Sequence, residues 1–145
     1  MLNEFIEEGK IFHCELIVPN DAIDQNGHMN NVVYVQWMQD VAVRHSELCG
    51  GTAAMESAGA TWVVRSHTIN YLSPAFAGDR IAAFTWVVDF QRVRSMRRYK
   101  FVRISDGKVL ARGQTDWVFL NAENGRPRTI PEEVKVCFST APDFE

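Results

Sequence analysis

The chain has 145 residues, enough for one domain with a substantial core, and we expect a single domain over residues 1–145. Its hydrophobic share of 46% and charged share of 23% are typical of soluble globular proteins and exclude a disordered or fibrous chain. Apolar runs are too short to cross a membrane, and no basic-then-apolar leader opens the sequence. We therefore expect a cytoplasmic protein that does not bind membranes.

Charge and cysteine content exclude further classes. A net charge of −3 argues against a dedicated nucleic-acid binder, which would carry a positive excess. Cys14, Cys49 and Cys137 are widely spaced and form no C-x-x-C pair. The pattern predicts neither a disulfide framework nor a structural zinc site, and we expect the three thiols to be small buried hydrophobes.

The first half of the chain predicts a strand, a turn-rich loop and a long helix. The strand covers residues 11–18 and ends before Pro19, and the loop that follows contains Gly27. From Asn31 to the Gly50–Gly51 pair, apolar residues recur at helical spacing. This stripe consists of Tyr34, Trp37, Met38, Val41, His45 and Leu48. On the other face, Asp40 and Arg44 stand at the spacing of an ion pair.

The second half predicts mainly β-structure. A short helix at residues 52–57 precedes four long strands at residues 61–72, 79–91, 95–105 and 108–120, and one helical turn is expected within residues 130–138. Consecutive strands joined by tight turns form an antiparallel sheet, and only the long helix can cover its apolar face. We predict an α+β fold in which about five strands wrap around one long central helix. Exposed sheet edges favour an oligomer.

Polar residues gather directly before the long helix. If Asn30 caps it, the N–H groups of Asn31, Val32 and Val33 lack partners, and the positive helix end could stabilise an oxyanion. Asp24 lies nearby and could attack a carbonyl or deprotonate water. The side chains that could orient the water or the substrate carbonyl are those of Asn26 and His28. An ordinary turn before a capped helix is the competing interpretation of the same residues.

Metal binding by this loop is disfavoured. A calcium loop that starts at Asp24 would have His28 at its fifth position and Val35 at its twelfth, where a bidentate acid is required. A transition-metal site built on Asp24 and His28 lacks a third ligand in the sequence. We therefore expect no metal.

The run DQNGHMNNVVY, from Asp24 to Tyr34, resembles the D-x-N-x-H-x-N-N-x-x-Y signature of hotdog-fold thioesterases. The chain is similar both to the 4-hydroxybenzoyl-CoA thioesterase type and to the acyl-ACP thioesterase type, over roughly residues 11–135. The resemblance implies the hotdog fold, in which a long helix lies inside an antiparallel sheet. Tyr34 fits the aromatic position of this motif, and we interpret it as a packing residue first and a pocket wall second.

The resemblance implies a role for each loop residue. In the first type, the aspartate at the place of Asp24 is a nucleophile or general base, and the main-chain N–H at the place of Asn31 polarises the thioester carbonyl. In the second type, Asp, Asn and His act together, which corresponds to Asp24, Asn26 and His28. The sequence satisfies both patterns, so both mechanisms stay open.

The expected function is an acyl-CoA thioesterase that releases a free carboxylic acid and coenzyme A, acting as a homodimer or homotetramer. It would need no cofactor, since coenzyme A is part of the substrate. The alternatives are an acyl-ACP thioesterase and a non-catalytic acyl-CoA-binding hotdog protein. Basic residues at 92–103 could contact coenzyme A phosphates or form a solvated strand face, and Arg65 and His67 could line a pocket or an interface.

Overall fold

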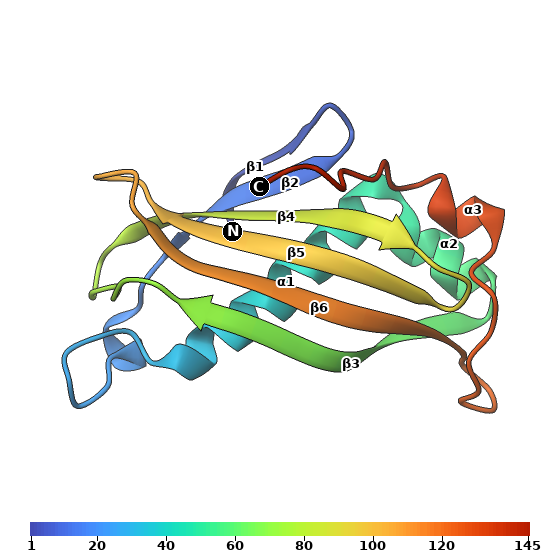
Figure 1. The fold of residues 1–145 in the computed structure, drawn as a ribbon, viewed down its shortest axis with the longest axis horizontal. Coiled ribbons are helices and arrows are strands. Elements are labelled where there is room, and N and C mark those ends of the chain that lie inside the picture. Colours follow the sequence, from blue (N-terminus) through green and yellow to red (C-terminus); the bar gives the residue numbers. More distant parts are fainter.

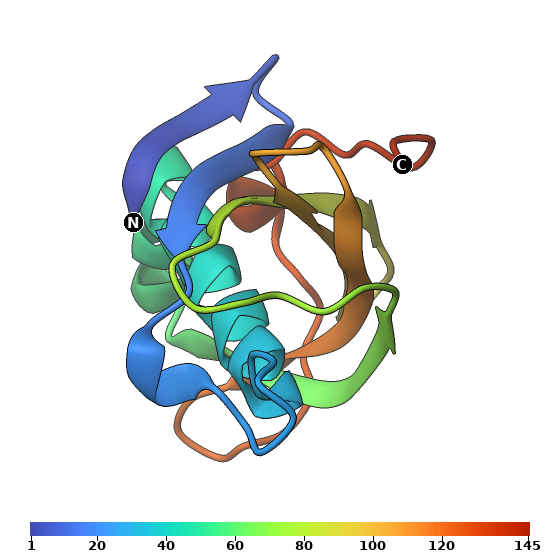
Figure 2. The ribbon, with the colours of Figure 1, turned by 90° about the vertical axis from the view of Figure 1, so that its left-hand side faces the viewer.

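The computed structural model covers residues 1–145 and contains one antiparallel sheet of six strands in the order β1-β2-β4-β5-β6-β3. The strands are β1 (Leu2–Glu7), β2 (Ile11–Ile17), β3 (Ala60–Tyr71), β4 (Arg80–Phe90), β5 (Arg94–Arg103) and β6 (Val109–Asn121). The helices are α1 (Asn31–Cys49), α2 (Gly51–Ser57) and α3 (Glu132–Lys135). Figure 1 shows the sheet lying across α1, and Figure 2 shows how it curves around that helix.

The long helix begins and ends where its sequence predicts. Asn30 has an extended backbone and caps α1 through its side chain, which accepts the N–H of Val32. Gly50 adopts φ +89°, a left-handed conformation that ends the helix. The buried side chains of α1 are those of Tyr34, Trp37, Met38, Val41, Ala42 and His45.

Two details of the helix differ from the prediction. Leu48 does not continue the buried stripe, because its side chain is largely exposed at the last turn of α1. Arg44 does not pair with Asp40; instead it forms a bidentate ion pair with Glu4 on β1 and a second contact with Glu47. The guanidinium group therefore fastens α1 to an N-terminal strand that the sequence did not predict.

The extra strand explains why the sheet has six strands and not about five. β1 pairs with β2 in antiparallel register, with an irregularity between Leu2 and Phe5. Its side chains are exposed or half-buried, so the sequence lacks the strong apolar alternation that marks an interior strand. Polar contacts, such as the hydrogen bond from Asn3 to Glu15, help to hold the strand, and Ile6 packs against the core.

The opposite edge of the sheet is β3. This strand pairs with β6 over its whole length, from Ala60 opposite Asn121 to Tyr71 opposite Ala111, and has no partner on its other side. It contains no proline, and Val63 and Tyr71 are exposed large side chains on it. Such a long unpaired edge is a template for a further strand.

Other predictions concern thiols and membranes. All three cysteines are free, and Cys14 is buried as expected, whereas Cys49 and Cys137 are only half-buried. None of the helices combines the length and the apolarity needed to span a bilayer.

Candidate functional site

The loop between β2 and α1 contains the short 3-10 helix η1 (Asn20–Ala22), followed by a tight backbone hairpin over residues 23–29. An isolated bridge pairs Ile23 with Met29, and inside it the N–H of Asp24 donates to the main-chain oxygen of His28 at 2.8 Å. The N–H of Gly27 closes the turn by donating to the oxygen of Asp24, and Gly27 adopts φ +78°. Because only glycine adopts this conformation readily, the sequence dictates the tip of the loop.

The Asp24 carboxylate lies over this turn. Its Oδ1 atom accepts the N–H groups of Asn26, at 2.8 Å, and of His28, at 3.2 Å. Its Oδ2 atom has no hydrogen-bond partner in the chain, and the residue is half-buried. One oxygen therefore fixes the orientation of the carboxylate, and the other is free to react.

The start of α1 offers one unpaired main-chain donor. Asn30 accepts two N–H groups, that of Val32 at its side chain and that of Val33 at its main-chain oxygen, each at 3.0 Å. The expectation that Val32 and Val33 are unpaired is therefore wrong, because the cap residue bonds both. The N–H of Asn31 has no partner in the chain, and it lies at the positive end of the helix dipole.

The structure brings three of the four candidate residues, Asp24, Asn26 and His28, together through the backbone, and no hydrogen bond joins them to Asn31. The Asn26 side chain is exposed and makes no hydrogen bond within the chain. The His28 ring packs edge-on against Phe76, with ring centres 5.4 Å apart. Neither side chain is bonded to the carboxylate of Asp24, which contacts only their N–H groups.

Two tyrosines flank the start of α1 in different ways. The hydroxyl of Tyr71, at the end of β3, donates to the main-chain oxygen of Asn31 at 3.2 Å. Tyr34 is buried against Trp37 and Phe101, and loss of solvent raises the pKa of its hydroxyl to about 12. Tyr34 thus packs in the core, which agrees with the first of its two expected roles.

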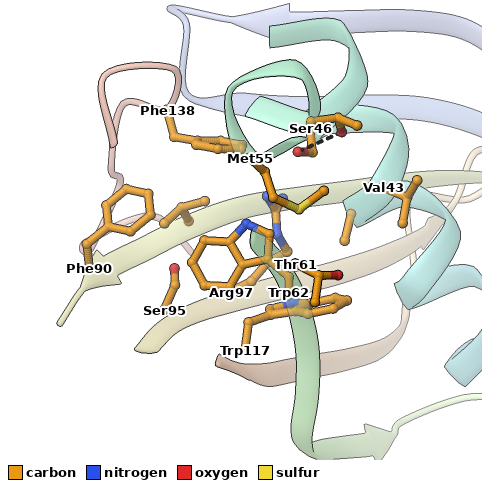
Figure 3. Close-up of a pocket in the computed structure, with 13 residues that line it drawn as sticks. Val43, Ser46, Met55, Thr61, Trp62, Phe90, Ser95, Arg97, Trp117 and Phe138 are labelled. Carbon is orange, nitrogen blue, oxygen red and sulfur yellow. Dashed lines mark hydrogen bonds between the residues drawn. The ribbon is translucent and has the colours of Figure 1, made fainter. Parts of the chain in front are cut away.

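Sequence reasoning missed a second feature, a cavity of about 240 Å³ near the other end of α1. It lies between α1, α2 and the sheet, and Figure 3 shows its lining side chains. Most of its walls are apolar, and they include Val43, Met55, Trp62, Phe90, Trp117 and Phe138. The one charged lining residue is Arg97 of β5.

Residues 17–138 match the sequence model of the Thioesterase-like superfamily. The chain belongs to this superfamily. Its hotdog fold is confirmed by the solved structure of a 1,4-dihydroxy-2-naphthoyl-CoA thioesterase from Synechocystis, with a TM-score of 0.78 and 16% identity. That alignment covers 88% of this chain and 94% of the Synechocystis chain.

The names of two curated relatives of this chain indicate different carriers of the acyl group, coenzyme A and acyl carrier protein. An L-carnitine dehydrogenase/betainyl-CoA thioesterase from Ruegeria pomeroyi is 28% identical over 123 residues, which is 84% of this chain and 25% of that protein. A chloroplastic palmitoyl-acyl carrier protein thioesterase from Cuphea hookeriana is 21% identical over 141 residues, which is 92% of this chain and 34% of that protein. The chain thus spans a quarter to a third of the length of these relatives.

The basic residues at 92–103 of this thioesterase-like chain do not form one continuous positively charged surface. Arg94 pairs with Asp116, and Arg103 pairs with Asp79 and Asp106, so both cations are neutralised by the protein. Arg97 points inward and is buried. The interpretation as a solvated strand face therefore fails for Arg97 and Arg103, whereas the Arg94 side chain is 38% exposed.

The two β3 residues singled out in the sequence have separate environments. Arg65 is exposed, beside an irregularity of the β3–β6 pairing. The His67 ring is 2.7 Å from the Thr115 hydroxyl and 3.5 Å from the Gln39 amide of α1, and burial lowers the pKa of His67. No group of three or more His, Cys, Asp or Glu side chains is placed to hold a metal ion.

Proposed function

We propose that the protein hydrolyses an acyl-CoA thioester to a free carboxylic acid and coenzyme A. The observation that carries the proposal is the unpaired N–H of Asn31, at the end of the loop that holds Asp24. One carboxylate oxygen of Asp24, Oδ2, has no hydrogen-bond partner in the chain. A single donor and a single carboxylate suit thioesters, because a thiolate leaves with little help from an acid. The names of the curated relatives, which are thioesterases, support the same reaction class.

Each group would have one role in this reaction. The thioester oxygen would accept the N–H of Asn31, where the helix dipole stabilises the oxyanion of the tetrahedral transition state. The Oδ2 atom of Asp24 would attack the carbonyl and form a mixed anhydride, or remove a proton from an attacking water. Asn26 and His28 would position the water or the substrate carbonyl. Neither route requires a cofactor or a metal ion.

A homodimer would complete the site. Asn31 and Ser46 are separated by 15 positions of α1, which corresponds to about 22 Å at 1.5 Å per residue, so the loop and the cavity of one protomer lie far apart. A two-fold antiparallel pairing of β3 with a second β3 would place the Tyr71 end of one strand beside the Trp62 end of the other. Tyr71 contacts Asn31, and Trp62 lines the cavity. The loop of each copy would therefore face the cavity of its partner.

The test of the proposal is Asp24→Asn. The amide keeps an Oδ1 acceptor for the two N–H groups, so the loop should persist while the nucleophile or base is lost. We expect turnover of acyl-CoAs, measured by thiol release, to fall by about 10²- to 10⁴-fold. Asp21→Asn, an exposed change before the hairpin, is the matched control and should leave turnover unchanged. Equal activity in Asp24→Asn and the unaltered protein would refute the role of Asp24.

An acyl-ACP thioesterase is the second candidate, favoured by the match to the Cuphea hookeriana protein over 92% of this chain. Competition between the same acyl group on coenzyme A and on acyl carrier protein, at equal concentration, distinguishes the two carriers. A third outcome, tight binding of acyl-CoAs without turnover on either carrier, would identify a non-catalytic binding protein.

A further inference from the structure

Arg97 is a buried cation that the protein does not neutralise. Only 5% of the residue is exposed, yet it forms no salt bridge. By contrast, Arg94 and Arg103 lie at the two ends of the same strand, and each pairs with a carboxylate. A guanidinium stays protonated in proteins, and burying a charge without a counter-charge is costly. The charge of Arg97 therefore has no counter-anion within the chain.

The hydrogen bonds of Arg97 leave donors free. Its Nη1 atom donates to His45 Nδ1 at 2.9 Å and to the hydroxyl of Thr85 at 3.1 Å, both of which are neutral acceptors. Its Nε and Nη2 atoms have no hydrogen-bond partner in the chain. The face of Phe138, 5.8 Å from the guanidinium carbon, is the remaining electron-rich group beside it. Two N–H-bearing nitrogens are thus available to a ligand.

The surroundings of Arg97 define the shape of that ligand. The guanidinium is part of the wall of the 240 Å³ cavity, whose other walls are mostly apolar (Figure 3). A molecule that fits would have an apolar body and an end that accepts hydrogen bonds. A planar carboxylate matches the donor geometry of a guanidinium.

We propose that this cavity receives the far end of the acyl group and that Arg97 selects acyl groups that end in a carboxylate. The inference rests on the proposed thioester hydrolysis and on the proposed pairing along β3, which would bring the loop of one copy to the cavity of its partner. It names the substrate class, the coenzyme A monothioesters of dicarboxylic acids. The aromatic walls would suit a quaternary ammonium group as well, but the positive charge of Arg97 disfavours a second cation there.

The kinetic test compares acyl-CoAs that differ only at the far end. Succinyl-, adipoyl- and suberoyl-CoA are paired with butyryl-, hexanoyl- and octanoyl-CoA, and kcat/KM is measured for each. We expect the carboxylate-ended substrate of the best pair to be preferred at least tenfold, mainly through a lower KM. Arg97→Met should remove this preference, so that kcat/KM becomes similar for the two members of each pair. Arg97→Lys, which keeps the charge, should retain part of it.

Arg126→Met is the matched control, because Arg126 is exposed on the loop after β6 and its side chain has no contact with the cavity. It should behave as the unaltered protein, and circular dichroism checks that each variant is folded. Preference for the neutral member of every pair would overturn the proposal. So would faster hydrolysis of an acyl-CoA that ends in trimethylammonium, or a carboxylate preference that survives Arg97→Met.

A binding experiment separates this inference from the proposed reaction. Hexanoate imitates the far end of the substrate, and hexanamide is its uncharged counterpart. By calorimetric titration of the Asp24→Asn protein we expect hexanoate to bind at least tenfold more tightly, and Arg97→Met to abolish the difference. If no acyl-CoA is hydrolysed but this difference is found, the reaction is wrong and the anion site stands. If hydrolysis is found without any such difference, the anion site is wrong and the reaction stands.

Discussion

The hydroxyl of Tyr71 donates to the main-chain oxygen of Asn31 at 3.2 Å, and this bond joins the end of the edge strand β3 to the first residue of α1. The N–H of Asn31 is unpaired, and in the proposed reaction it donates to the oxyanion. The position of the donor therefore depends on β3 as well as on the loop.

Removal of this bond should affect catalysis more than stability. Tyr71→Phe deletes one exposed hydrogen bond, so we expect a loss of about 0.5 kcal/mol in the free energy of unfolding. We expect kcat to fall severalfold because the helix start is less firmly held. Tyr34→Phe is the control: its buried hydroxyl has no partner, so its loss should be neutral or stabilising. Urea titration and steady-state kinetics on both variants test the contrast.

Proline at position 31 tests the main-chain donor directly. Asn31 is the first residue of α1, where proline is well tolerated, and the extended backbone of Asn30 suits a residue before proline. Asn31→Pro thus removes the N–H and little else, and we expect kcat to fall by about 10²- to 10³-fold. Asn31→Ala keeps the N–H and should stay active. Similar rates for the two variants would exclude Asn31 as the oxyanion donor.

The pair of His45 and Arg97 predicts how stability depends on pH. Burial, and then the charge of Arg97, lower the pKa of His45 to about 2. Below about pH 6.5, His45 is protonated in the unfolded chain but stays neutral in the folded chain. The free energy of unfolding therefore decreases as the pH falls from there toward 2. His45 alone contributes a slope of up to about 1.4 kcal/mol per pH unit.

His45→Gln should flatten this dependence. Urea unfolding between pH 6 and pH 4 measures the slope for both proteins, and His13→Gln serves as the control because His13 lies on β2, in contact with Glu7 and away from Arg97. An unchanged slope in His45→Gln would mean that His45 is not the group that couples protonation to unfolding.

The edge strand predicts the effect of a charge on assembly. If two copies pair along β3, Val63→Lys should weaken the dimer, because an exposed lysine on an edge strand opposes strand addition. Sedimentation velocity should then show a shift toward monomer. Turnover should fall in parallel, because the loop of one copy would no longer face the cavity of its partner. A Val63→Lys protein that sediments as the unaltered one would place the interface elsewhere.

The features that the sequence predicted are those set by local rules. The helix from Asn31 to Cys49 follows from its cap, its apolar spacing and Gly50, and the loop turn follows from Asp24 and Gly27. Strand β1 escaped prediction because a half-exposed edge strand carries little apolar signal. Its ion pair with Arg44 joins residues 40 positions apart, and spacing along one helix cannot anticipate such a pair.

The cavity escaped prediction for a related reason. Arg97 stands among basic residues that suggest a solvated face, yet along β5 it shares the buried side of the strand with Tyr99 and Phe101. The alternation of the strand therefore held the necessary signal. The free N–H of Asn31 was predicted, whereas the bonding of Val32 and Val33 depends on how far the cap side chain and carbonyl reach.

The hairpin from Ile23 to Met29 is closed by main-chain bonds, whereas the walls of the cavity are made by side chains from distant elements. Substitutions that enlarge, shrink or recharge the cavity would leave the geometry of the hairpin intact. Reactivity and choice of substrate would then be separable traits, and an engineer could exchange one acyl preference for another without rebuilding the reactive centre.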